Sequence, residues 1–198
     1  MGAWVRLARV SVLAAAAFVV ATSAHAQDTS KFDLAFGYQA LKVDNSPCAD
    51  CSTDWYSWGF NVDGGYKLRA PWSVVGEFYW SRHPFDEDPT RHNGGLNAAD
   101  LGAGMRWSSS TKSKFAPYAQ LTMGFHRDFY TGTKAPGLLT FVGDEVPQSA
   151  FMVHPSGGVY VRTGDWWGFM GQVGYRHSFT TEGINGVHFV AGVRLNTK

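Results

Sequence analysis

Large apolar residues alternate with small or polar ones along almost the whole chain from residue 31 onward, and this period of two constrains the fold most. Successive side chains of a β-strand point to opposite faces, so the alternation predicts strands with two chemically different faces. The stretch from Val62 to Trp80 shows it on both sides of Pro71. Eight segments alternate in this way: residues 31–43, 56–68, 72–81, 99–107, 115–130, 151–162, 167–179 and 186–196.

The lengths of these segments and of the connections between them indicate a membrane barrel. A tilted strand needs about nine to eleven residues to cross a bilayer. The connections at 69–71, 108–114 and 163–166 are short, whereas those at 45–54, 84–97 and 131–149 are longer. Short turns at one end and longer connections at the other are typical of a transmembrane β-barrel. We therefore predict an all-β fold, a closed antiparallel eight-stranded transmembrane β-barrel.

The first 26 residues have the pattern of a cleaved signal peptide. Arg6 and Arg9 precede an apolar run at 10–20 that is too short to span a bilayer as a helix. The sequence Ala24-His25-Ala26 then forms a cleavage site with small residues at its first and third positions. We predict that residues 1–26 are removed and that residues 27–198 form one exported domain.

Alternation alone leaves open which face meets water, since a lipocalin-like soluble barrel would place its apolar set inside. An eight-stranded barrel has an interior only just wide enough for side chains to fill. The many aromatic residues here, 15% of the chain, are too bulky for that interior. The other set is rich in glycine and opposite charges, which suits a plugged lumen where buried charges pair. We expect these charges to form a lumenal network: Asp33, Asp63, Lys67, Glu77, Asp100, Arg106, Asp128, Arg162, Arg176 and Arg194.

The apolar face is therefore predicted to meet lipid. Aromatic residues flank both the short turns and the longer connections, as do the girdles at the two membrane–water boundaries of such barrels. The net charge of +1 gives no basis for a nucleic-acid partner, which a basic patch would indicate.

The signal peptide, the eight alternating segments, the turn "KLRAPWS" and the closing "GVHFVAGVRL" resemble small outer-membrane barrels of the OmpA/OmpX type. The resemblance implies an outer-membrane β-barrel domain over residues 27–198, located in the Gram-negative outer membrane as a monomer without a cofactor. It also implies a non-enzymatic role in envelope integrity or in surface interaction through the outer connections.

Four basic residues interrupt the apolar face near the longer connections: Lys42, Arg82, Arg127 and His177. Lipopolysaccharide in the outer leaflet carries phosphates, which such side chains bind through charge-assisted hydrogen bonds. We expect these four to contact outer-membrane lipid and lipopolysaccharide. The alternative is that they extend toward the interface without a specific ligand.

Cys48 and Cys51 lie in the first long connection. In an oxidising compartment we expect them to form a local disulfide. Redox chemistry and metal binding with His83 or His92 are the alternatives, and we predict no metal site.

Two other functions stay open. Lipid A deacylases of this architecture carry a lipid-facing His and Ser two positions apart with a distant Glu. Here the alternation places His177 on the lipid-facing side, as in those enzymes, but Phe179 stands where they have the serine. Ser178 is predicted to point into the lumen, and Glu182 lies in a connection between strands. The nucleophile, base and orienting residue are therefore not brought together, and we predict no catalytic residues. The second alternative to a surface role is a narrow channel for small solutes. The apolar centre of the longest connection comprises Leu138, Leu139, Phe141 and Val142. It could be an adhesive site for an extracellular ligand, insert into the membrane interface, or pack on the barrel rim.

Overall fold

The computed structural model describes residues 31–44, 55–84, 95–109, 113–131, 149–179 and 184–196. Within these ranges, no helix is long and apolar enough to cross a membrane. The strands are β1 (Phe32–Asp44), β2 (Trp55–Tyr56), β3 (Trp58–Arg69), β4 (Trp72–Pro84), β5 (Gly95–Ser108), β6 (Phe115–Thr131), β7 (Ser149–Arg162), β8 (Trp167–Ser178) and β9 (Ile184–Asn196). The predicted signal peptide lies outside the described residues.

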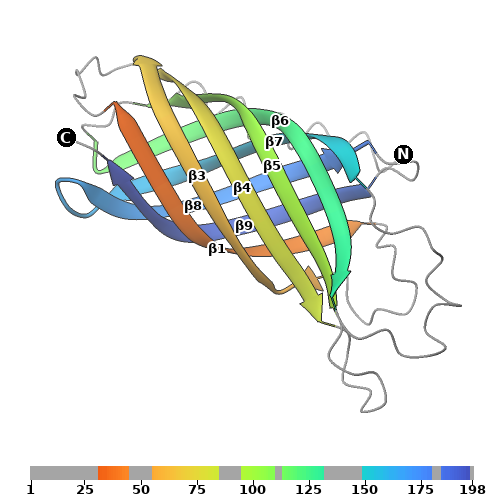
Figure 1. Cartoon of the computed structure of the whole chain (residues 1–198). Helices are drawn as coiled ribbons and strands as arrows, with labels where there is room; N and C mark the ends of the chain where they lie inside the picture. The colour runs from red at the N-terminus through yellow and green to blue at the C-terminus, as the bar shows by residue number, and fades with distance from the viewer. Residues whose placement is uncertain are drawn as a thin grey trace, which may run out of the picture.

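The sheet closes on itself into a barrel of eight long strands. Each long strand pairs antiparallel with its neighbours in chain order, and β1 pairs with β9 from Asp33 opposite Asn196 to Asp44 opposite Asn185. Figure 1 shows these strands steeply tilted around a common axis. Closure leaves the long strands without a free edge, so their backbone groups are paired inside the sheet. The predicted eight-stranded antiparallel barrel is confirmed.

One predicted segment, 56–68, is divided in the structure. Tyr38 pairs with Phe60, but Leu41 pairs with Tyr56 instead of with Ser57, so the register slips by one residue between β3 and β2. A slip of one residue turns a side chain to the opposite face. The alternation along residues 56–68 puts Tyr56 with the apolar, lipid-facing set, and this prediction is wrong: Tyr56 is buried in the lumen, and Trp55 is exposed in its place.

Pro155 is the second irregular position. A proline cannot donate a ladder hydrogen bond, so the sequence predicts either a bulge at Pro155 or a strand that starts later. Instead β7 begins at Ser149, and Pro155 pairs with Leu121 on β6. On the β8 side the ladder is interrupted between Val153 and Ser156, but the register is the same on both sides of the gap. The chain therefore accommodates Pro155 by leaving out ladder pairs.

The two faces separate as predicted. Along β8, buried and exposed residues alternate without a break from Gly168 to Arg176. The outward set is apolar and includes exposed aromatic residues near both ends of the barrel: Trp58, Tyr66, Trp72, Phe115, Phe151 and Phe179. The inward set is mostly polar, and more polar or charged residues than apolar ones are buried there. The apolar outer face suits contact with lipid. The polar residues that could carry a function therefore lie in the lumen and at the charged outer rim, and these are the candidate site.

Candidate functional site: the polar lumen and the outer rim

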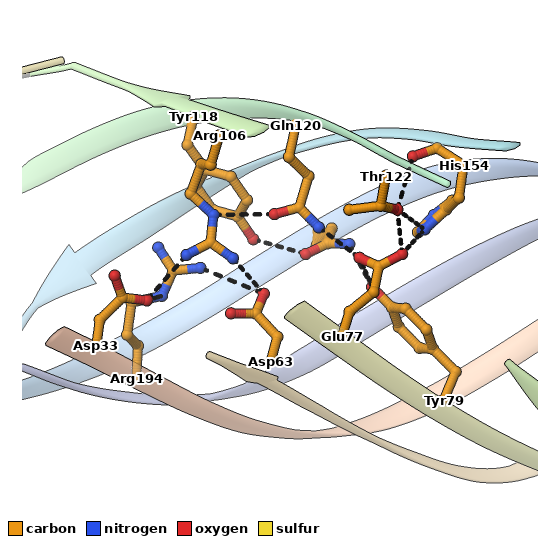
Figure 2. Close-up of polar contacts among 11 residues, drawn as sticks. Asp33, Asp63, Glu77, Tyr79, Arg106, Tyr118, Gln120, Thr122, His154 and Arg194 are labelled. Carbon is orange, nitrogen blue, oxygen red and sulfur yellow. Dashed lines mark hydrogen bonds and ion pairs between the residues drawn. The ribbon is translucent and has the colours of Figure 1, made fainter. Parts of the chain in front are cut away.

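The lumen near the short turns is organised around Arg106 of β5, which is 1% exposed. Its Nη1 donates to Asp33 Oδ1 at 2.8 Å, its Nη2 contacts Asp63 Oδ2, and its Nε donates to Gln120 Oε1 at 2.9 Å. Arg194 of β9 adds a second guanidinium, 3.7 Å from Asp33 and 3.8 Å from Asp63. Figure 2 shows this cluster on its left side. Two carboxylates and two guanidiniums thus balance one another, as buried charges require.

Tyr118 of β6 connects this cluster to the middle of the lumen. The Arg194 and Arg106 guanidiniums lie 4.6 and 5.3 Å from the centre of its ring, within the range of cation–π contacts. Its hydroxyl donates to Gln172 Oε1 at 2.9 Å. Tyr118 therefore lies between the two guanidiniums on one side and the neutral amide of Gln172 on the other.

Glu77 of β4 is the centre of the middle cluster. His154 Nδ1 lies 2.6 Å from its Oε1, Gln120 Nε2 donates to its Oε2 at 2.7 Å, and the Thr122 hydroxyl donates to Oε1. The Tyr79 hydroxyl lies 3.3 Å from Oε2. Figure 2 shows these donors converging on the carboxylate from β6, β7 and β4. Glu77 is thus satisfied by hydrogen bonds, and among these four contacts there is no guanidinium.

A third cluster lies nearer the long connections. His126 is placed between two carboxylates, with Nδ1 2.6 Å from Asp100 Oδ1 and Nε2 2.8 Å from Asp128 Oδ2. Arg176 Nη1 donates to Asp100 Oδ2 at 2.7 Å. Ionised carboxylates only accept hydrogen bonds, so this geometry calls for an N–H on both ring nitrogens of His126. A positively charged imidazole therefore helps to balance the two carboxylates.

Eight of the ten predicted lumenal charges belong to these clusters: Asp33, Asp63, Glu77, Asp100, Arg106, Asp128, Arg176 and Arg194. The other two, Lys67 and Arg162, face inward near the short turns, where they are partly exposed. The side chains that connect these charges were not predicted as part of the network, although they lie on the same face of the strands: Tyr79, Tyr118, Gln120, Thr122, His126, His154 and Gln172.

The four outward basic residues form a ring near the long connections. Lys42, Arg82, Arg127 and His177 lie on β1, β4, β6 and β8. In sheet order one strand separates each from the next, so no two of them are on adjacent strands. Lys42 and Arg127 are exposed, and Arg82 and His177 are partly exposed. His177 Nδ1 lies 2.6 Å from Asn185 Oδ1. The structure thus distributes these residues around the barrel and gathers them at no single point.

The remaining predicted positions are only partly described. Ser178 is fully buried and Phe179 is exposed, so the residues beside His177 have the parity that the sequence predicts. His83 faces the lumen, with Nδ1 2.8 Å from the Trp55 carbonyl oxygen. Cys48, Cys51, Glu182, His92 and residues 138–142 lie outside the described residues. The predicted disulfide therefore stays a prediction.

Comparison with known proteins agrees with this geometry. A model of the outer membrane protein beta-barrel domain matches residues 11–196. The chain belongs to this family. Membership implies location in the outer membrane, while the cleavage site after Ala26 stays a prediction. No curated protein matches the sequence.

Solved barrels are similar to this chain in fold. Neisserial surface protein A has a TM-score of 0.57 at 14% identity, and the match covers 86% of this chain and 100% of that one. OprG of Pseudomonas aeruginosa has a TM-score of 0.56 at 10% identity, and the match covers 85% of this chain and 96% of OprG. Ail, the attachment invasion locus protein of Yersinia pestis, has a TM-score of 0.51 at 16% identity, and the match covers 84% of this chain and 99% of Ail. At these identities the likeness shows the fold alone.

Proposed function

We propose that this protein is a non-enzymatic outer-membrane barrel that acts at the cell surface, in envelope integrity or in contact with an extracellular ligand. The observation that carries the proposal is the filled lumen. Three clusters of buried, mutually bonded side chains occupy the interior of the described strands. With the interior used for stability, the longer outer connections and the outer rim are the surfaces left for function.

The same observation argues against a channel. A solute passing through would have to separate buried ion pairs such as Arg106 with Asp63, and leaving one member of such a pair alone costs several kcal/mol, on the order of 3–5. Known porin channels have about sixteen strands, which leave room for water. A narrow channel is therefore the weaker candidate.

Lipopolysaccharide is the ligand that we propose for the outer rim. The ring of Lys42, Arg82, Arg127 and His177 is at the end of the barrel with the longer connections, which is the extracellular end in this family's architecture. One basic residue on every second strand suits a layer of phosphate groups around the barrel better than a single phosphate held by several residues.

Two of the similar structures support a surface role by analogy. Ail is described as an attachment invasion locus protein and the Neisserial protein as a surface protein. Since the likeness is one of fold, it lends support to the class of function and to no particular ligand.

The lipopolysaccharide proposal is tested by comparing two double variants. Arg82→Ala with Arg127→Ala removes two members of the outer ring, and Arg69→Ala with Lys114→Ala removes two exposed basic residues near the short turns. We expect lipopolysaccharide to raise the unfolding temperature of the wild type and of the second variant, and to raise it less for the first. Equal stabilisation of all three would reject the ring as a binding site.

An enzymatic function has its own test. Incubation of the folded barrel with lipid A, followed by mass spectrometry, should leave the lipid unchanged. Loss of an acyl chain that depends on His177 would favour the lipid-modifying alternative.

A further inference from the structure

An apolar groove runs across the lipid-facing side of the barrel near the short turns. It crosses β1, β3, β4 and β5, which are neighbours in the sheet (Figure 1), and has a volume of about 830 Å³. That volume is within the range of ligand-binding clefts. Its lining includes Gly64 and Tyr66 before the turn between β3 and β4, Val74 and Gly76 after it, and Leu195 near the end of β9.

The floor of the groove is a row of small outward-facing residues that the strand register aligns. Gly64 pairs with Leu34 on one side and with Gly76 on the other, and Gly76 pairs with Ala103. Larger outward residues form a row on either side of this floor: Phe32, Tyr66, Val74 and Met105 toward the short turns, and Phe36, Val62, Phe78 and Leu101 toward the long connections. The two rows are separated by about 13 Å from backbone to backbone, so the groove is a trough between them.

The packing of the strands does not require glycine at the floor. A Cβ atom added at Gly64 or Gly76 would lie 3.9 Å from its nearest neighbours, which is ordinary contact, and neither residue has a left-handed backbone. At Gly104 and Gly192, by contrast, an added Cβ would fall on the backbone of the adjacent strand. Glycine weakens a strand interior and often marks a place where a ligand or another backbone approaches closely. The paired glycines therefore indicate that something lies against the barrel wall here.

The position and length of the trough fit a lipid acyl chain. The row rises from the short-turn edge toward the middle of the barrel, because Leu195 is next to the end of β9 whereas Ala103 lies well inside β5. Four strand spacings separate these two residues, or about 19 Å. One leaflet contributes about 15 Å of the hydrocarbon core, which a chain lying obliquely along the row would span. Short turns mark the periplasmic end in this family's architecture, so this is the inner, phospholipid leaflet.

The walls of the trough argue against a second copy of this chain as the occupant. Phe32 and Tyr66 are exposed, and their ring centres are 4.9 Å apart, so together they project beyond the glycine floor. The broad wall of another barrel would rest on these rings and leave Gly64 uncovered. A single acyl chain is narrow enough to reach the floor.

The short-turn end of the barrel is basic, as a phosphate headgroup requires. Apart from Asp33, which contacts Arg106, the exposed or partly exposed charged residues described there are Lys31, Lys67, Arg69, Lys114, Arg162 and Asp165. Lys31 precedes β1, beside the end of β9 where the trough begins. The Asn196 N–H donates to the Trp166 carbonyl oxygen at 2.7 Å, so the exposed Trp166 lies at the same edge, in a position that suits the membrane–water boundary.

We propose that this trough binds one acyl chain of an anionic phospholipid of the inner leaflet, with the lipid phosphate beside Lys31. Basic clusters at a membrane surface attract anionic headgroups, and the apolar trough adds contact for the chain. The site is at the opposite end of the barrel from Lys42, Arg82, Arg127 and His177, so it stands independently of lipopolysaccharide binding at that ring.

Native mass spectrometry of the folded mature barrel, released from detergent micelles with added phosphatidylglycerol, tests the proposal. We expect one phosphatidylglycerol to stay bound per chain. Phosphatidylethanolamine with the same acyl chains has no net charge, and we expect it to bind about two- to fivefold more weakly.

Two lipid-facing glycines supply a matched pair of variants. Gly64→Leu fills the trough, whereas Gly171→Leu adds the same side chain on β8, where a Cβ meets nothing within 4 Å. We expect Gly64→Leu to weaken binding by at least about tenfold, since the chain loses contact with the floor, and Gly171→Leu to bind like the wild type. Lys31→Gln should weaken binding about two- to fivefold, and Lys114→Gln should leave it unchanged. Folding of each variant is checked by its faster migration on a gel before boiling.

Three results would overturn the proposal. Equal binding by Gly64→Leu and Gly171→Leu would mean that the whole outer surface holds lipid without a site. Equal affinity for the two phospholipids would reject the anionic headgroup. A dimer that forms in the wild type and is lost in Gly64→Leu would assign the trough to a second copy of the chain. If Gly64→Leu does not fold, Gly76→Leu replaces it, because a Cβ there also has only ordinary contacts.

Discussion

Asp63 and Glu77 face the same lumen from directly opposed positions on β3 and β4, yet they are stabilised by different partners. Asp63 lies against the guanidiniums of Arg106 and Arg194. Glu77 accepts hydrogen bonds from side chains of β6 and lies against His154 of β7. Like charges opposite each other on a sheet repel, and here each carboxylate has its own set of partners, with Gln120 bonded both to Arg106 and to Glu77. Asp63 thus belongs to a balanced ion-pair cluster, the ion-pair half of the lumen, whereas Glu77 is held mainly by hydrogen bonds and is the centre of the hydrogen-bonded half.

The largest effect should come from breaking the ion-pair half. Arg106→Met removes the guanidinium that contacts both Asp33 and Asp63, leaving the buried Asp63 and the partly exposed Asp33 with only the more distant Arg194. We expect a loss of about 3–5 kcal/mol in the free energy of unfolding, measured by urea titration in lipid vesicles. Arg69→Met, at an exposed position, is the control. A loss no larger than that of the control would show that the cluster does not stabilise the barrel.

A smaller effect should come from the hydrogen-bonded half. Glu77→Gln keeps the shape of the side chain but replaces one acceptor oxygen by a donor, which then faces the donors now bonded to Glu77. We expect a loss of about 1–3 kcal/mol by the same titration. A loss equal to that of Arg106→Met would remove the distinction between the two halves.

The smallest effect should come from Arg162, which faces inward near the short turns but is partly exposed. Arg162→Met exchanges the same residue types as Arg106→Met on the same face of the sheet. Because Arg162 remains in contact with water, we expect a change of less than about 0.5 kcal/mol. A larger loss in this variant would mean that the charge network extends to the rim of the barrel.

The strands and their faces could be predicted from the sequence because a closed barrel keeps every strand two-sided. The alternation placed Asp33, Glu77 and Arg106 inward and Phe125 outward, where the structure has them. The prediction was wrong at Tyr56, where a one-residue slip between β2 and β3 reverses the face. A local irregularity of that kind leaves no trace in the period of two.

The partners across the lumen could not be predicted. Arg106 reaches Asp33 although 73 residues separate them in the chain. Parity gives the face of a side chain, but its height along the barrel depends on strand tilt and stagger, which link every strand to the next. The outer ring was easier to predict, because its members lie near strand ends that the long connections mark.

Single-channel recording of the wild-type barrel in planar bilayers shows whether bonded side chains close the lumen. Insertion is verified by gel migration of the recovered protein before and after boiling. A closed lumen predicts no discrete conductance steps from verified protein. Reproducible, ion-selective steps would contradict it, because they require an open path through the Arg106, Glu77 and Asp100 clusters.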